Sequence, residues 1–162
     1  MAHIVHIGLG GNLGDAEATL RQALRALDGL PGTRCLATSR LYRTPAWGRL
    51  DQPAFVNAAA TVQTTLAPEA LLDALLALER EHGRERPDGQ RWGPRTLDLD
   101  VLLFDEQVID TPRLKVPHPH LHERAFALLP LAEIAPDARI PGHGTVQAAL
   151  AVVETGGLAP IG

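Results

Sequence analysis

The run from Thr96 to Phe104 constrains the fold more than any other stretch of the sequence. Residues two apart in a strand point to the same face, so Asp98 and Asp100 project side by side. The opposite face is apolar, with Leu97, Leu99, Val101 and Leu103. Beyond Asp100 the first face becomes apolar too, at Leu102 and Phe104. We therefore predict a central strand with two carboxylates at its entrance.

The segments around this strand predict an α+β domain. In chain order, they are a strand at Ile4–Leu9, a helix between Asp15 and Gly29, strands at Arg34–Tyr42 and Phe55–Thr64, a helix from Pro68 to Gly83, the strand at Thr96–Phe104, and helices near Glu123–Ile134 and Val146–Val152. The first six follow the βαββαβ order of a ferredoxin-like core, with helices packed on a mainly antiparallel sheet. Residues Gly156 to Pro160 are expected to form a loose tail.

The composition is that of an ordinary globular domain spanning residues 1–162, with 45% hydrophobic and 21% charged residues. A net charge of −4 without a basic block argues against nucleic-acid or membrane partners. The N-terminus lacks a signal-peptide pattern, and no apolar run approaches the roughly 18 residues of a membrane span. The lone cysteine, Cys35, fits a reducing compartment. We expect a cytoplasmic monomer that acts on small molecules.

The acidic pair suggests a metal site. Two carboxylates about 7 Å apart on one strand face repel each other unless a cation or a basic side chain relieves the charge. Magnesium prefers a few carboxylates with water and phosphate oxygens, and two such ions can bridge a polyphosphate. Upstream lies a polar, glycine- and proline-containing loop with Trp92 and four arginines, Arg84, Arg86, Arg91 and Arg95. This loop predicts a lid that contacts phosphate oxygens. The alternative is that both aspartates pair with these arginines.

Three alternating histidines suggest a different site. His118, His120 and His122 would share one face of an extended chain, and Pro117 and Pro119 favour extension. Imidazoles bind zinc, but no cysteine lies nearby to complete such a site. Surface histidines, or one nucleotide contact, are the favoured interpretation.

Several motifs resemble the hydroxymethyl-dihydropterin pyrophosphokinase family. The resemblance is carried by Arg91–Asp100, Leu9–Gly14, Tyr42–Pro45, Asp51–Ala59, Val116–His120 and Arg124–Phe126, and it extends from Ile7 to about Pro136. It implies a ferredoxin-like α+β fold, ATP as co-substrate, two Mg²⁺ ions and 6-hydroxymethyl-7,8-dihydropterin as acceptor. The implied reaction is in-line attack of the hydroxymethyl oxygen on the β-phosphorus of ATP, with AMP leaving. Gly11, Leu76, Pro87 and Pro119 depart from the family's usual residues.

The resemblance also implies residue roles. Asp98 and Asp100 would hold the two magnesium ions and, with Arg84 and Arg95, would form the catalytic group. The substrate-binding residues would be Thr44, Pro45, Trp47, Phe55, Asn57, Trp92, Arg124 and Phe126, with Phe55 and Phe126 sandwiching the pterin ring. The nucleotide side would comprise Glu79, Arg84, Arg86, Arg91, Trp92, Arg95, Arg113, Lys115, His118 and Arg124.

Without the family, several of these residues have simpler interpretations. Phe55 could be a strand core residue, Asn57 a turn cap, Glu79 a solvated helix charge, and Arg113 and Lys115 simple surface charges. At the level of function, two rival classes are an RNA-binding module and a metal-dependent phosphohydrolase that uses the same aspartates. The RNA-binding class is disfavoured by 4% aromatic content and a negative net charge.

Overall fold

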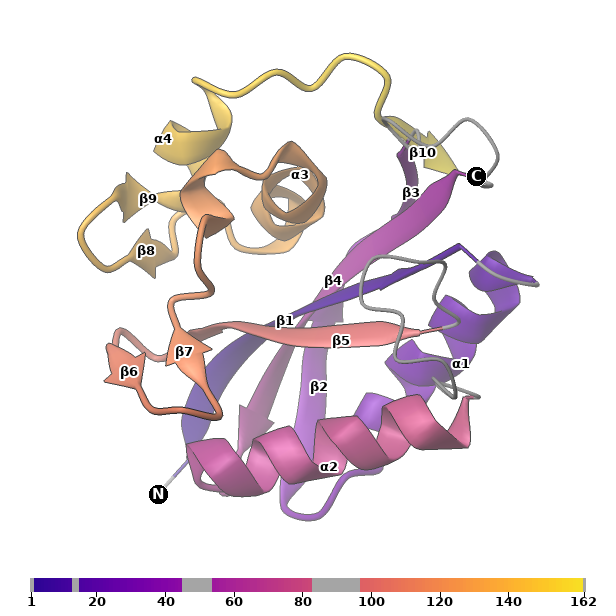
Figure 1. Cartoon of the computed structure of the whole chain (residues 1–162), viewed down its shortest axis with the longest axis vertical. Coiled ribbons are helices and arrows are strands. Elements are labelled where there is room, and N and C mark those ends of the chain that lie inside the picture. Colours follow the sequence, from indigo (N-terminus) through magenta and orange to yellow (C-terminus); the bar gives the residue numbers. More distant parts are fainter. Residues whose placement is uncertain (1, 13–14, 45–53, 83–96, 162) are drawn as a thin grey trace.

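The computed structural model describes residues 2–12, 15–44, 54–82 and 97–161, and it has the predicted α+β architecture. Its core elements are β1 (His3–Gly11), α1 (Ala16–Leu27), β2 (Thr33–Thr38), β3 (Leu41–Thr44), β4 (Phe55–Thr64), α2 (Pro68–Glu81) and β5 (Asp98–Phe104). Within the described residues, the main sheet has the order β10-β3-β4-β1-β5, where β10 is Ala159–Ile161, and β2 also pairs with β4. All of these pairs are antiparallel. In this part of the chain β5 stands at the end of the strand order, so the prediction of a central strand there was wrong. Figure 1 shows β1 and β4 passing through the middle of the molecule.

The second predicted strand, Arg34–Tyr42, is interrupted and forms both β2 and β3. The break falls at Ser39, whose N–H donates to Ala59 O at 2.8 Å. The Ser39 hydroxyl accepts the Ala59 N–H, also at 2.8 Å. A side chain thus takes the place of one backbone partner, and the two halves pair with different parts of β4.

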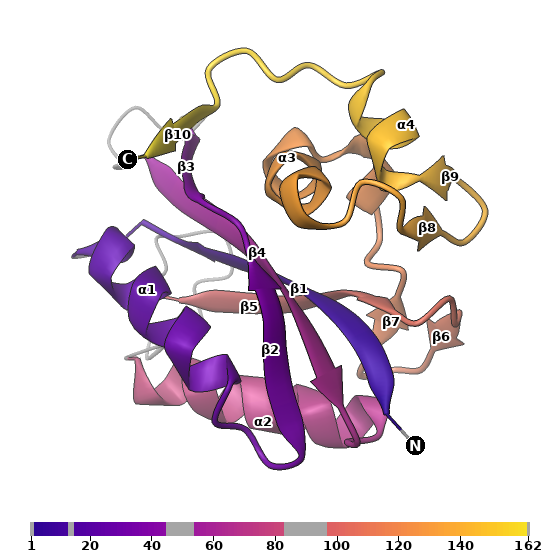
Figure 2. The ribbon, with the colours of Figure 1, turned by 180° about the vertical axis from the view of Figure 1, so that it is seen from behind.

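One face of the sheet is covered by α1 and α2, as Figure 2 shows from behind. Asp15 caps α1 by accepting the Ala18 N–H, and the helix buries Leu20, Ala23 and Leu27. The second helix begins at Pro68 and buries Leu71, Leu75 and Leu78. Complete burial of one such leucine contributes about 1.5–3 kcal/mol. These side chains form the larger core, together with Val5, Ile7, Val62 and Phe104.

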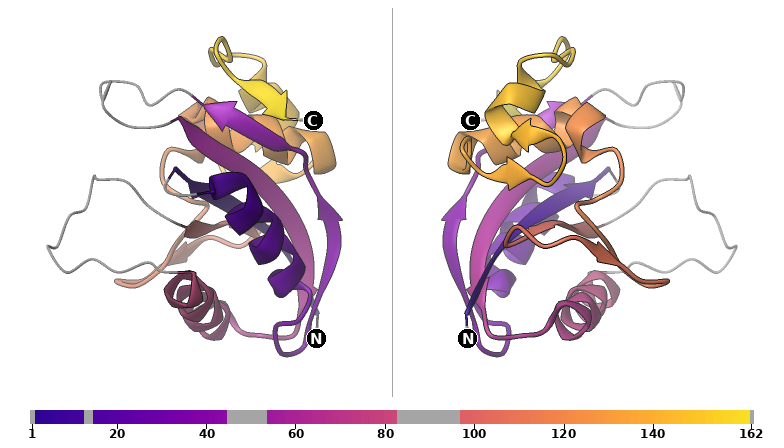
Figure 3. Two further views of the ribbon diagram at one scale, coloured as in Figure 1. Left: turned by 90° about the vertical axis from the view of Figure 1, so that its right-hand side faces the viewer. Right: turned by 90° about the vertical axis from the view of Figure 1, so that its left-hand side faces the viewer.

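The other face is covered over part of its length by C-terminal elements. These are the 3-10 helix η1 (Leu121–Glu123), α3 (Ala125–Ile134), α4 (Val146–Leu150) and the hairpin of β8 (Arg139–Ile140) and β9 (Gly144–Thr145). They form a second core around Leu128 and Leu131, which reaches Ala59 of the sheet. The side views show these segments gathered at one end of the molecule (Figure 3). The rest of this face holds the candidate site.

A bulge in β5 changes the predicted facing of its last residues. His6 pairs with Leu103 and Ile7 with Val101, so β5 has one extra residue at this point. Leu102 and Leu103 consequently both pack in the second core, and Phe104 packs in the first. The prediction that Leu103 lies with Val101, and Phe104 with Leu102, was wrong.

The C-terminal tail is also more ordered than predicted. Residues Ala159–Ile161 form β10, which pairs with Leu41–Arg43 of β3. Between β5 and η1 lies a further hairpin, made of β6 (Ile109–Asp110) and β7 (Lys115–Val116). Among the described residues, no helix has the length and apolar character that a membrane span requires.

Candidate active site

A row of residues crosses the sheet on the face that α3 partly covers. Asp98 of β5 lies opposite Gly10 of β1, Gly10 opposite Asn57 of β4, and Asn57 opposite Tyr42 of β3. Directly opposite residues of antiparallel strands share a face. The row therefore brings residues from the acidic segment and from the predicted pterin-side segment onto one surface.

Glycine at position 10 is required by the close packing of this row. A Cβ atom there would lie 2.9 Å from Asn57 Oδ1, which is closer than a carbon atom and an amide oxygen can approach. Gly8, opposite Asp100, is nearly as tight, because its Cβ would lie 3.3 Å from the Leu102 side chain. The two glycines leave no side chain on β1 between the aspartates and β4.

Asp98 and Asp100 are half-buried and point to the same face of β5, as predicted. His118 approaches this pair, with its Nε2 atom 3.7 Å from Asp100 Oδ1. Its backbone N–H donates to Leu102 O at 3.0 Å, which ties the segment after β7 to β5. The structure therefore brings the predicted nucleotide histidine next to the predicted metal ligands.

The protonation state of His118 follows from its contacts. Burial lowers the pKa of His118, against the opposing effect of the Pro119 carbonyl. Nδ1 lies 2.9 Å from that carbonyl oxygen, which can only accept, so Nδ1 carries the hydrogen. In the neutral ring Nε2 then directs a lone pair toward the side of Asp100. Because Mg²⁺ prefers oxygen ligands, the two carboxylates are the expected donors to such an ion, and this nitrogen lies beside them.

Glu79 lies behind the acidic pair. Its side chain is 2% exposed, so its interpretation as a solvated helix charge was wrong. Oε2 accepts the Leu99 N–H at 2.7 Å, which connects α2 to β5 between the two aspartates. A buried carboxyl oxygen that accepts a backbone N–H ties the helix to the strand.

The predicted pterin-side residues are adjacent across β3 and β4. Thr44 pairs with Phe55, and Asn57 Nδ2 donates to Thr44 Oγ1 at 2.8 Å. Asn57 lies inside β4, so its interpretation as a turn cap was wrong. Phe55 is half-buried and is not part of either core cluster. This corner of the sheet thus presents an aromatic ring beside an amide.

Two further predicted residues stand at the start of α3. Arg124 precedes the helix and Phe126 lies in its first turn, and both are half-buried. The Arg124 guanidinium carbon is 5.8 Å from the Phe126 ring centroid, within cation–π range. Because α3 packs on β4, its first turn brings an aromatic ring and a cation to the same face as Asn57.

Two further predicted cations that the structure describes, Arg113 and Lys115, lie in surface ion pairs. Arg113 pairs with Glu69, at 3.1 Å, and with Asp73, both on α2. Lys115 pairs with Asp110 across the β6–β7 hairpin. These contacts match the simpler interpretation of both residues as surface charges.

The alternating histidines diverge in space. His118 faces Asp100, whereas His120 contacts Glu123 and His122 stacks on His143 with ring centroids 3.7 Å apart. Within the described residues there is no group of three or more His, Cys, Asp or Glu that could hold a metal ion. The zinc alternative therefore has no support there, and a cation at the aspartates would need water or phosphate oxygens to complete its shell.

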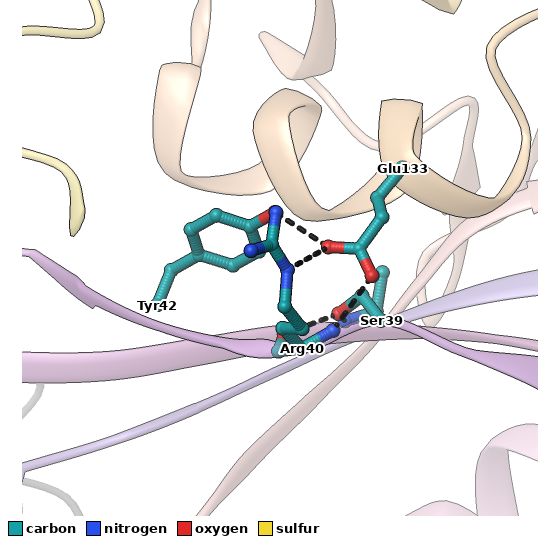
Figure 4. A network of polar contacts seen from close by, with 5 residues as sticks. Ser39, Arg40, Tyr42 and Glu133 are labelled. Carbon is teal, nitrogen blue, oxygen red and sulfur yellow. Dashed lines mark hydrogen bonds and ion pairs between the residues drawn. The ribbon is translucent and has the colours of Figure 1, made fainter. Parts of the chain in front are cut away.

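Part of the predicted site lies outside the described residues. These residues are Pro45, Trp47, Arg84, Arg86, Arg91, Trp92 and Arg95, and they include the whole predicted lid. A feature that sequence reasoning missed is a polar network in which Glu133 of α3 contacts Arg40 and Tyr42 of the sheet (Figure 4). The partners are more than 90 residues apart in sequence, so no local pattern indicates the pairing.

Comparison with known proteins identifies the family. Residues 6–136 match the model of the 7,8-dihydro-6-hydroxymethylpterin-pyrophosphokinase family, abbreviated HPPK. The chain belongs to the HPPK family. This confirms the resemblance noted in the motifs, and the match covers both aspartates, Asn57 and Phe126.

Individual HPPK relatives agree with this assignment. The chain is 54% identical over 141 residues to a 2-amino-4-hydroxy-6-hydroxymethyldihydropteridine pyrophosphokinase of Pseudomonas aeruginosa, covering 87% of this chain and 86% of the relative. It is 46% identical to the protein of that name from Methylorubrum extorquens, over 94% of this chain and 95% of the relative. Wild-type Plasmodium falciparum HPPK-DHPS solved with pteroate has a TM-score of 0.74 at 15% identity. That alignment covers 93% of this chain but only 44% of the solved one, and it supports the fold.

Proposed function

We propose that the chain transfers pyrophosphate from ATP to 6-hydroxymethyl-7,8-dihydropterin in folate biosynthesis, giving AMP and the pterin diphosphate (EC 2.7.6.3). Family membership is one support for this activity. The observation that carries it is the shared sheet face, where Asp98 and Asn57 lie in one row across the strands. Asp100 and Thr44 flank this row, and Thr44 accepts a hydrogen bond from Asn57. An acceptor bound at β3 and β4 would lie beside phosphates bound at β5.

In this mechanism the acceptor oxygen forms a bond to the β-phosphorus, and the bond between that phosphorus and the α-phosphate oxygen breaks. AMP leaves with the electron pair, and the proton of the hydroxymethyl group passes to Asp98 or to water. Asp98 and Asp100 would hold two Mg²⁺ ions, which offset charge on the phosphates. His118, beside Asp100, would contact the nucleotide on the same side. Rate acceleration then rests on alignment and charge neutralisation.

The acceptor would bind where aromatic and amide groups gather. Asn57, held by Thr44, would bond the polar edge of the pterin, and Phe55 and Phe126 would stack on its faces. Arg124 would contact the phosphates or the pterin from the start of α3. Pro45 and Trp47 would also bind the pterin. Glu79, Arg113 and Lys115 would lie on the nucleotide side of the site. The lid residues Arg84, Arg86, Arg91, Trp92 and Arg95 would close over ATP.

Incubation of the protein with ATP, magnesium and the hydroxymethyl-dihydropterin tests the proposal. We expect AMP and the pterin diphosphate by chromatography, in amounts that depend on all three additions. Phosphate release without the acceptor would favour the phosphohydrolase alternative. Retention of RNA on filters at moderate salt would favour the RNA-binding alternative. We also propose that the protein is a cytoplasmic monomer. Light scattering on the purified protein tests the monomeric state.

A further inference from the structure

Glu133, near the end of α3, receives hydrogen bonds from two residues at the break between β2 and β3. Tyr42 donates its hydroxyl to Oε1 at 2.5 Å. Arg40 donates its backbone N–H to Oε2 at 3.0 Å and its side-chain Nε–H to Oε1 at 3.3 Å. We call this group the Glu133 clamp, comprising Glu133, Tyr42 and Arg40 (Figure 4). Both carboxylate oxygens are used, and the Tyr42 ring is 3% exposed.

The clamp is continuous with the sheet beneath it. Ser39, next to Arg40, exchanges two hydrogen bonds with Ala59 of β4. Arg40 also donates to the Tyr42 hydroxyl at 3.4 Å. Among the described residues, α3 also packs on the sheet through apolar side chains, such as Leu128 and Leu131 around Ala59. Apolar contacts have no preferred direction, whereas charge-assisted hydrogen bonds fix a geometry. Glu133 and Arg40 are exposed, whereas Tyr42 is buried. The clamp therefore adds a direction to a position of α3 that the apolar contacts hold.

This position matters for the proposed pterin site because α3 and Tyr42 both reach it. Tyr42 lies opposite Asn57 in the strand register, and Thr44 is two residues further along β3. Glu133 and Phe126 belong to the same helix, seven residues and about 10 Å apart. The helix is continuous from Ala125 to Ile134, although Pro130 inside it removes one backbone hydrogen bond. We therefore expect a shift at Glu133 to reach Phe126 and Arg124 through the helix.

We propose that the Glu133 clamp is a positioning device for the acceptor. It sets the separation between Phe126 on α3 and Phe55 and Asn57 on β4, and so controls pterin affinity without touching the ligand. This inference rests on the proposed function, because it assumes that the pterin lies between these residues. A clamp that only stabilised the fold would have no preference between pterin and ATP.

The test compares Tyr42→Phe, Glu133→Gln and the double variant in the full chain. Tyr42→Phe keeps the buried ring and removes only the hydroxyl. Calorimetry with the pterin and, separately, with a non-hydrolysable ATP analogue plus magnesium measures both affinities. We expect each single variant to weaken pterin binding about tenfold and the ATP analogue by less than about twofold. The double variant should lose less affinity than the two single losses added together, because both substitutions alter the contact between Tyr42 and Glu133.

Glu17→Gln is the matched control. Glu17 of α1 pairs with Arg43 of β3 at 3.4 Å. Arg43 follows Tyr42 in the sequence, but its ion pair lies on the other face of the sheet. This variant should leave both affinities unchanged. The inference is overturned if the clamp variants bind pterin within about twofold of wild type, or if both ligands weaken equally. Phe126→Ala, measured alongside, distinguishes failure of the clamp from failure of the proposed pterin site. Normal pterin affinity in that variant would contradict the pterin site itself.

Discussion

Glu79 Oε2 accepts the backbone N–H of Leu99 at 2.7 Å, at the point of β5 that separates Asp98 from Asp100. The helix residue is 2% exposed, so its carboxylate acts inside the protein. The contact fixes the strand that carries both acidic side chains, and it does so from the face opposite to theirs. A rigid β5 keeps the two carboxylates at a constant separation, as a site for paired cations requires.

Replacement of Glu79 tests this anchor. Glu79→Leu leaves the Leu99 N–H without its acceptor, so we expect the free energy of unfolding to fall by about 1–3 kcal/mol. Glu79→Gln retains an acceptor oxygen and should cost less. Denaturant unfolding measures both. Glu81→Leu, at an exposed position of the same helix, should stay within about 0.5 kcal/mol of wild type. A Glu79→Leu protein as stable as the Glu81 control would contradict the anchor.

The acidic pair itself should be essential for turnover but not for folding. We expect Asp98→Asn and Asp100→Asn each to lower kcat by about a hundredfold or more, because each deletes a charge that the bound cations need. Circular dichroism of both variants should stay native-like. Asp137→Asn, at an exposed position between α3 and β8, serves as a control with unchanged turnover. Near-normal transfer by either β5 variant would exclude the two-ion role.

The three phenylalanines of the chain separate ligand stacking from core packing. We expect Phe55→Ala and Phe126→Ala to weaken pterin binding by about tenfold each, with little effect on an ATP analogue. Phe104 is fully buried, so Phe104→Ala should instead cost about 3–5 kcal/mol of stability. Calorimetry and denaturant unfolding on all three variants make the comparison. Equal losses of both ligands in the Phe55 and Phe126 variants would indicate general damage rather than stacking.

His6 should make the fold sensitive to acid. Burial lowers the pKa of His6 to about 4, and its Nδ1 lies 2.9 Å from Thr61 Oγ1. Between about pH 6.5 and pH 4 the unfolded chain binds a proton on His6 that the folded chain does not. Its contribution to stability is therefore complete above the unfolded pKa and is lost as the pH falls toward the folded one.

The size of this effect is measurable. At about pH 5 the wild type should have lost about 2 kcal/mol through His6 relative to about pH 7.5. His6→Gln lacks the titrating ring. Between the two pH values its free energy of unfolding should therefore fall by about 2 kcal/mol less than that of the wild type. Urea unfolding at the two pH values gives the comparison. The same pH dependence in both proteins would contradict the assignment.

Much of the fold could be predicted because it depends on local patterns. The alternation around Asp98 indicated the strand and its acidic face, and the leucine stripe of the first helix indicated its buried side. The break at Ser39 could not be predicted. It arises because the Ser39 hydroxyl accepts a backbone N–H of β4, and the sequence does not show which strand lies beside Ser39. The bulge at Leu102 and Leu103 has the same origin, since only the register with His6 shows the extra residue.

The candidate site divides in a similar way. The motif residues Asp98, Asn57 and Phe126 could be named in advance, since each belongs to a recognisable string. The roles of Glu79 and Glu133 could not, because a glutamate on a helix looks like a surface charge until its partner is known. Leu99 is 20 residues from Glu79, and Tyr42 is 91 residues from Glu133. Contacts of this kind are set by packing, and no period in the sequence indicates them.

The most direct test of the central claim follows the β-phosphorus of ATP. Purified protein is incubated with magnesium, the hydroxymethyl-dihydropterin and ATP labelled at the β-phosphate, and the products are separated by chromatography. The proposed reaction gives labelled pterin diphosphate with an equal amount of unlabelled AMP, and Asp98→Asn gives neither. Labelled ADP as the nucleotide product, or labelled free phosphates at a rate independent of the pterin, would contradict the assignment of this chain as a pyrophosphokinase.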